Sequence, residues 1–139
     1  MAAGNIKLEI VTPEKVVVSE DSQIVMAPGV LGEFGVLIGH TPFMTTLKLG
    51  TIRYVDKSGK ERFVFISGGF AEALPDKVTV LAESAERRSQ IDVDRAKSAL
   101  QRAQERLAKE DDETIDRVRA RAAMERALHR LKIAAIRAS

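Results

Sequence analysis

The side chains that could carry out catalysis are few in this sequence, and they are widely spaced. Cysteine is absent, which excludes thiolate nucleophiles, disulfide frameworks and Cys-ligated zinc. The only two histidines, His40 and His129, fall in segments of different composition. The acidic run 111–113 offers oxygen ligands of the kind that divalent ions prefer, but an exposed, solvated turn explains the same run. We therefore predict no catalytic residue and no metal site.

The glycine-rich segment 29–35 resembles the loops that hold phosphate groups. A phosphate-binding loop of this kind continues into Lys-Ser or Lys-Thr and opens a helix, and neither feature follows here. Glycine is also the residue that adopts a positive φ without strain. We expect these glycines to serve turns.

A break in composition near Ala85 divides the chain in two. Every glycine, every proline and every aromatic residue of the 139 lies between Met1 and Ala85. Residues 86–139 are rich in alanine and in charged residues, a composition typical of helices. We therefore predict two domains, 1–85 and 86–139.

The first domain has the pattern of short strands separated by turns. Ile6, Leu8 and Ile10 alternate with polar residues, so that one face of the strand packs on a core. Gly59 and the pair Pro75-Asp76 supply hairpin turns. An all-β sandwich follows, with strands expected at 6–10, 15–19, 22–27, 43–49, 51–56, 62–67, 69–74 and 77–83.

The second domain has two stretches of helical periodicity divided by 109–113. Each carries one narrow apolar stripe, made by Val93, Ala96, Leu100, Ala103 and Leu107 in the first and by Ala120, Met124, Ala127, Leu131 and Ala134 in the second. Such stripes pack two helices together, which predicts an antiparallel α-helical hairpin. Because alanine buries little area, we expect the hairpin to open easily.

Five segments together resemble bacterial F-type ATP synthase epsilon subunits. They are 11–13, 32–42 (Gly-Glu-Phe-Gly-Val-Leu-Ile-Gly-His-Thr-Pro), 67–70 (Ser-Gly-Gly-Phe), 78–82 and 91–96 (Ile-Asp-Val-Asp-Arg-Ala), and their order and spacing are more specific than any one of them. The resemblance implies a noncatalytic rotor subunit of the central stalk, peripheral at the cytoplasmic face of the bacterial plasma membrane. Its helices would inhibit ATP hydrolysis.

The resemblance also implies which residues meet partners. It places Glu33 toward the c ring and His40 near the gamma subunit, whereas the residues alone are equally compatible with a solvated turn carboxylate and a loop histidine. The second helix would reach the beta subunit when the hairpin opens. Its cations are Arg117, Arg119, Arg121, Arg126, Arg130 and Arg137.

Segment 91–96 has two interpretations. Asp92 can cap a helix, with Ile91 and Ala96 as a hydrophobic staple, and this explanation is sufficient. Family members with this motif bind ATP as a regulatory ligand, and the positions that match their pattern are Glu86, Ile91, Asp92, Arg95, Ala96, Arg102, Arg126 and Arg130. Arginine suits phosphate oxygens. By spacing alone, however, Arg95 and Arg102 lie about 140 to 160° from the Leu100 stripe, on a solvated face.

Other classes of protein fit less well. Nucleic-acid binding is not expected, because acidic residues interleave with the arginines after Ala85 and no aromatic residue lies there to stack on bases. We also expect no direct membrane insertion, because no apolar run approaches a membrane span, and no secretory signal at the N-terminus. The alternative is a helical hairpin that regulates another enzyme such as RNA polymerase.

Overall fold

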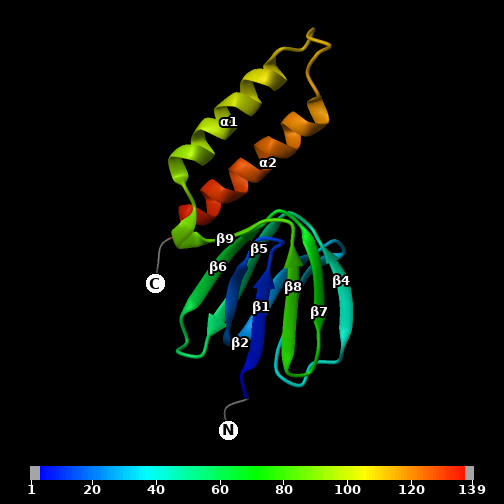
Figure 1. The fold of residues 1–139 in the computed structure, drawn as a ribbon, viewed down its shortest axis with the longest axis vertical. Coiled ribbons are helices and arrows are strands. Elements are labelled where there is room, and N and C mark those ends of the chain that lie inside the picture. Colours follow the sequence, from blue (N-terminus) through cyan, green and yellow to red (C-terminus); the bar gives the residue numbers. More distant parts are fainter. Residues whose placement is uncertain (1–3, 137–139) are drawn as a thin grey trace. The chain divides into compact units, whose positions relative to one another are not determined.

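A computed structural model of the chain describes residues 4–136 and divides into two compact units (Figure 1). The first is a β-sandwich that extends to Arg88, and the second is a helical unit that begins at Ser89. The composition break had suggested Ala85 as the last residue of the sandwich. The sandwich continues further because residues 85–87 form a short strand on its edge, paired with residues 64–66.

Nine strands of the described residues form the sandwich. They are β1 (Ile6–Val11), β2 (Val16–Gly29), β3 (Gly32–Val36), β4 (Phe43–Leu47), β5 (Gly50–Asp56), β6 (Glu61–Ile66), β7 (Gly69–Ala73), β8 (Lys77–Ala82) and β9 (Ala85–Arg87). Alternation produces them as expected: in β1, Ile6, Leu8 and Ile10 are fully buried and the residues between them are half-buried. The all-β sandwich predicted from the sequence is confirmed.

The strand β2 belongs to both layers of the sandwich. The strands pair in the order β1-β8-β7-β4-β2-β5-β6-β9, β3 pairs with β2, and β1 also pairs with β2. Residues 16–22 of β2 pair with β1, and residues 22–26 pair with β5 after a register shift between Ser22 and Ile24. The buried side chains of both layers, among them Leu8, Val25 and Ile52, form one core.

Three details of the strand prediction were wrong. The two strands expected at 15–19 and 22–27 are one strand, because the polar residues Glu20 and Asp21 keep their pairing with β1. The glycine-rich segment contains β3, which pairs with the end of β2, and of its three glycines only Gly32 has a positive φ. The third difference is β9, which was not predicted because two of its three residues are charged.

The turn between β5 and β6 is organised by Asp56. One carboxylate oxygen, Oδ1, accepts hydrogen bonds from the Ser58 amide and hydroxyl and from the Lys60 amide, and Oδ2 accepts one from Arg62 Nε at 3.0 Å. Gly59, at φ +88°, completes the expected hairpin. The Ser58 hydroxyl, the Lys60 amide and the Arg62 guanidinium all stabilise the carboxylate, so the pKa of Asp56 lies well below its usual range.

The strand β9 is fastened to the sandwich by Arg87. Its Nε donates to the Val17 carbonyl at 3.0 Å, and its Nη1 donates to the Tyr54 hydroxyl at 3.2 Å and lies 3.7 Å from Glu20 Oε1. The Tyr54 hydroxyl in turn donates to Glu20. Burial, together with this bond to the carboxylate, raises the pKa of Tyr54. One side chain thus ties the last strand to β2 and β5.

The helical unit contains α1 (Val93–Ala108) and α2 (Arg117–Ala134), which run antiparallel and contact each other (Figure 1). A 3-10 helix, Arg88–Gln90, precedes them. Each α-helix begins after an aspartate whose side chain accepts from the third amide along, Asp92 from Arg95 and Asp116 from Arg119, both at 3.0 Å. The predicted hairpin and the Asp92 cap are confirmed.

The two apolar stripes face each other mainly through alanine. The buried stripe residues are Ala96, Ala103, Ala120 and Ala127, and the larger stripe residues Leu100, Leu107, Met124 and Leu131 are only half-buried. Val93, the first residue of α1, was also expected on the stripe but is exposed. Ile133, which lies off the predicted stripe, is also buried. The contact between the helices is therefore narrow, as the spacing indicated.

A chain that ends at Arg88 should fold, whereas one that ends at Ser84 should melt at a lower temperature. The shorter chain lacks β9, so the backbone of β6 loses its partner, and Tyr54 and Glu20 lose Arg87. Thermal unfolding followed by circular dichroism measures both chains. Arg87→Met in the chain that ends at Arg88 removes the contacts of the Arg87 side chain and keeps β9. Equal melting temperatures of this variant and its parent would contradict the role given to Arg87.

Replacing Asp56 by asparagine should change how stability depends on pH. Because the pKa of Asp56 is lower in the folded chain than in the unfolded one, the carboxylate stabilises the fold above about pH 4 and loses this effect as the pH falls further. Asp56→Asn should thus be less stable than the parent at pH 7, with a gap that narrows toward pH 2. Urea unfolding at several pH values measures the gap, and a constant gap would contradict the prediction.

Candidate docking and ligand sites

Seven of the eight residues matched to an ATP-binding pattern lie in the helical unit. Ile91 and Asp92 precede α1, Arg95, Ala96 and Arg102 lie on α1, and Arg126 and Arg130 lie on α2. The start of α1 and the end of α2 share one end of the hairpin, as the ribbon shows (Figure 1). Glu86 is different, because it lies on β9 in the sandwich.

The geometry around Asp92 is that of a helix cap. Its Oδ1 is occupied by the Arg95 amide, and Ile91 and Ala96 are both buried, as a hydrophobic staple requires. Arg95 and Arg102 are exposed, in agreement with the solvated face indicated by their spacing. Arg126 and Arg130 are half-buried. Asp92 Oδ2 and these arginines are the groups that could meet a phosphate-bearing ligand.

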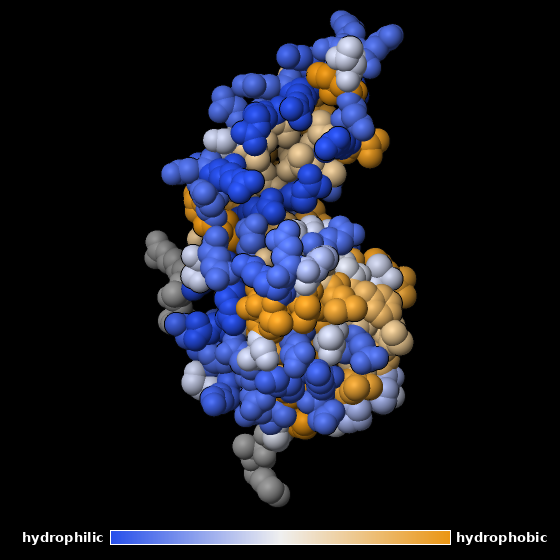
Figure 2. Space-filling view, in the orientation of Figure 1, coloured by the Kyte–Doolittle hydropathy of each residue, from blue (hydrophilic) through white to orange (hydrophobic). Residues whose placement is uncertain are grey.

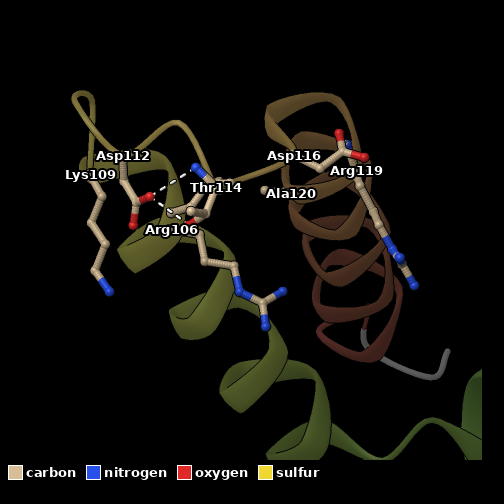
Figure 3. A pocket seen from close by; sticks show the side chains of 8 residues that line it. Arg106, Lys109, Asp112, Thr114, Asp116, Arg119 and Ala120 are labelled. Carbon is tan, nitrogen blue, oxygen red and sulfur yellow. Dashed lines mark hydrogen bonds between the residues drawn. The ribbon is translucent and has the colours of Figure 1, made fainter.

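A cavity of the hairpin lies at the opposite end, at the tip, and the sequence analysis did not predict it. It measures about 600 Å³ and is lined by Arg106, Lys109, Asp112, Thr114, Ile115, Asp116, Arg119 and Ala120. Figure 3 shows the three cationic side chains spread across its width rather than pointing toward a common centre. Asp116 caps α2. The charges do not converge on one ligand, so this cavity is a gap between helix ends.

The tip itself is an ordered turn built on Asp112. Its Oδ1 accepts from the Thr114 amide at 2.9 Å and from the Thr114 hydroxyl at 2.6 Å (Figure 3). The bonds from the Thr114 hydroxyl and amide lower the pKa of Asp112, and nearby Lys109 and Arg117 add to the effect. The acidic run 111–113 thus contains a structural aspartate in an exposed turn, as the simpler interpretation held.

Glu33 lies beside an apolar hollow in the sandwich. The hollow, about 430 Å³, is lined by Gly29, Leu31, Gly32, Glu33, Phe34, Phe43, Met44 and Thr45. Leu31 is 98% exposed and Met44 63% exposed, so large apolar side chains face solvent there. Glu33 is itself exposed and accepts from Arg53 Nη2 at 3.0 Å. An exposed apolar surface with a charged rim is typical of protein contact sites.

His40 is connected to this hollow through aromatic rings. Its Nδ1 lies 2.6 Å from the Thr41 carbonyl, and its ring centroid lies 5.0 Å from that of Phe43. The rings of Phe43 and Phe34 are nearly perpendicular, with their centroids 5.1 Å apart. The chain of rings runs from His40 to Phe34, the residue after Glu33. The rings that begin at His40 therefore end one residue along the chain from Glu33, the other predicted partner contact.

A second apolar surface lies on the outer face of a sheet. Phe70 on β7 and Leu81 on β8 are cross-strand partners, and both are exposed. The space-filling view shows apolar surface over these strands (Figure 2). The sequence does not predict this surface, because an apolar residue in a strand is equally compatible with a buried and an exposed position.

Residues 4–136 contain neither a metal-binding cluster of side chains nor a membrane-spanning helix. No group of three or more acidic or histidine side chains in this range is arranged to hold a metal ion. No helix in the same range is long and apolar enough to cross a membrane. Arg137, counted above among the cations of the second helix, falls outside the described residues.

Two family models match almost the whole chain, and they meet at the boundary between its two units. Residues 5–88 match the β-sandwich domain of the ATP synthase delta/epsilon chain, and residues 89–135 match the long α-helix domain of the same chain. The chain belongs to the ATP synthase epsilon chain family.

Curated relatives agree over most of the length. The chain is 67% identical over 110 residues to the ATP synthase epsilon chain of Desulfatibacillum aliphaticivorans, covering 79% of this chain and 78% of the relative. It is 61% identical over 131 residues to that of Desulforapulum autotrophicum, covering 94% and 96%. A chain in a solved structure of the Euglena gracilis mitochondrial ATP synthase, with OSCP, F1 and the c-ring, is 25% identical with a TM-score of 0.74, covering 90% of this chain and 78% of that one.

As a member of this family, the chain is a noncatalytic subunit of ATP synthase. The sequence prediction of an F-type epsilon subunit is thereby confirmed. The match covers the sandwich and the helices alike, so it favours this family over a hairpin regulator of another enzyme such as RNA polymerase.

Proposed function

We propose that this chain is a rotor subunit of the central stalk, in which the sandwich joins gamma to the c ring. A chain of similar fold, 10% identical at a TM-score of 0.55, occurs in a solved structure of the central stalk and c-ring of the Tetrahymena thermophila mitochondrial ATP synthase. The complex would lie at the cytoplasmic face of the bacterial plasma membrane. Torque transmission needs a stiff body with contact surfaces, and the continuous core supports that role.

The surfaces of the sandwich suit two protein partners. The hollow beside Glu33, with exposed Leu31 and Met44, would meet the c ring, where the carboxylate faces polar loops at the membrane surface. His40 and the rings beside it would lie against gamma. The exposed pair Phe70 and Leu81 offers further apolar area to the same subunit. Burying such side chains supplies the affinity that a permanent stalk contact requires.

The helical unit would inhibit ATP hydrolysis by opening and reaching the beta subunit. The observation that supports this most directly is the narrow contact between α1 and α2, whose buried stripe residues are alanines. Each buried CH₂-sized group contributes about 0.8 kcal/mol, so a modest competing contact can separate the helices. The cations of α2 would then meet an acidic segment of beta. Exposed ion pairs contribute about 0 to 1 kcal/mol each, so several must act together.

Removing residues 114–139 should raise the rate of ATP hydrolysis by the complete ATP synthase without impairing its assembly. The deletion removes α2 and its cations and leaves the sandwich surfaces unchanged. Hydrolysis by purified complexes, with subunit content checked on gels, provides the measurement. An unchanged rate in a fully assembled complex would remove inhibition from the proposed function.

We further propose that ATP acts as a regulatory ligand of the closed hairpin. Asp92, Arg95 and Arg102 come from α1, whereas Arg126 and Arg130 come from α2, so only the closed hairpin brings the two sets together. A ligand shifts an equilibrium only by its differential affinity for the two states. If the open form does not bind, ATP at about 100 times its dissociation constant favours closure by roughly 2.7 kcal/mol.

Asp92→Ser should separate a ligand contact from the cap. Serine keeps the cap, because its hydroxyl also accepts from the helix amides, but it removes the carboxylate that would receive the adenine amine or a ribose hydroxyl. We expect Asp92→Ser and Arg126→Ala to lose the calorimetric heat of ATP binding while their helix content persists, and Arg121→Ala, an exposed control on α2, to bind normally. No heat for the parent chain at millimolar ATP would leave Asp92 as a helix cap only.

A further inference from the structure

Arg117 contacts the helix that precedes its own. It is the first residue of α2, and its Nη1 donates to the Leu107 carbonyl of α1 at 3.2 Å. Its Nη2 donates to the carbonyl of Lys109, the C-cap residue of α1. The side chain is half-buried, whereas Arg119 and Arg121 on the same helix are exposed. Two atoms of one guanidinium therefore hold two carbonyls of the other helix.

These carbonyls are ones that α1 cannot satisfy by itself. The last four carbonyls of an α-helix lack intrahelical donors, and the same end of the helix carries a partial negative charge. In α1, the Lys109 amide donates back only to Arg106. Arg117 donates to both carbonyls, the second of which also accepts from the Asp112 amide, and it brings a positive charge to this end of α1. Hydrogen bonds from a charged donor are stronger than those between neutral groups.

The turn at the tip positions Arg117 for these contacts. Asp112 donates from its amide to the Lys109 carbonyl at 3.2 Å, and its carboxylate holds Thr114. Ile115 donates back to the Asp112 carbonyl at 3.4 Å, and the Asp116 cap then starts α2. The path from Lys109 to Arg117 is hydrogen-bonded at several points, so the guanidinium returns to the end of α1 instead of extending into solvent.

We propose that Arg117 is a latch that holds the helical hairpin closed, and that opening the hairpin frees its guanidinium for a carboxylate of the partner. This inference rests on the proposed inhibitory function. The donors belong to α2 and the acceptors to α1, so both bonds exist only while the helix ends lie together, and they favour the closed state selectively. Arg117 is thus a positioning residue. In the closed hairpin its bonds to α1 oppose docking, and in the open hairpin its guanidinium contributes to docking.

The latch and a simple docking role predict opposite results for Arg117→Gln. Loss of two charge-assisted bonds should raise the ratio of open to closed hairpin about tenfold. Loss of one exposed ion pair at the partner weakens docking by at most about fivefold. The latch therefore predicts stronger inhibition and slower ATP hydrolysis by the complete ATP synthase. A residue that served only as a docking cation would give faster hydrolysis in the same variant, which would overturn the proposal.

Hydrogen exchange of the full chain tests the latch without the partner. Arg117→Gln should lower the protection of the amides in the last turn of α1 and the first turn of α2 about tenfold, whereas Arg121→Gln, the same charge change at an exposed position, should leave it unchanged. Equal protection in the two variants would overturn the latch. If removal of residues 114–139 leaves the rate of ATP hydrolysis unchanged, the proposed inhibitory function is wrong. Hydrogen exchange then still tests whether Arg117 holds the hairpin closed.

Discussion

The sandwich depends on one strand that serves both of its layers. The long β2 pairs with β1 over its first half and with β5, β3 and β4 over its second, and the register shift between Ser22 and Ile24 lets it change partners. Without that shift the two layers would have separate edges with unpaired backbone groups. The surfaces proposed for partners lie on strands and loops that this shared strand holds in place.

Much of this fold could be predicted from the sequence, because alternation and turn residues are local signals. Ile6, Leu8 and Ile10 indicate a strand by themselves, and Asp92 indicates a cap. The short β9 could not be predicted from such a pattern. Its Arg87 contacts Val17, Tyr54 and Glu20, which are far away in the chain. These contacts form only in the folded protein, so no local sequence pattern indicates the strand.

The candidate sites were predicted to different extents. The resemblance pointed to Glu33 and His40, but the row of rings from His40 through Phe43 to Phe34 is visible only in the structure. Arg117 was counted merely as one cation among several on its helix. A positive charge at the start of a helix interacts unfavourably with the dipole of that helix. The structure explains its presence in α2, because the Arg117 guanidinium bonds to carbonyls at the end of α1.

The alanines between α1 and α2 also bear on how the hairpin responds to temperature. Alanine has no side-chain rotamers to immobilise, so closure orders few side chains beyond the half-buried leucines. The heat-capacity change of a transition grows with the apolar area that it exposes, and separating these helices exposes little. The free-energy difference between the closed hairpin and the open form proposed above should therefore depend on temperature almost linearly, with little curvature.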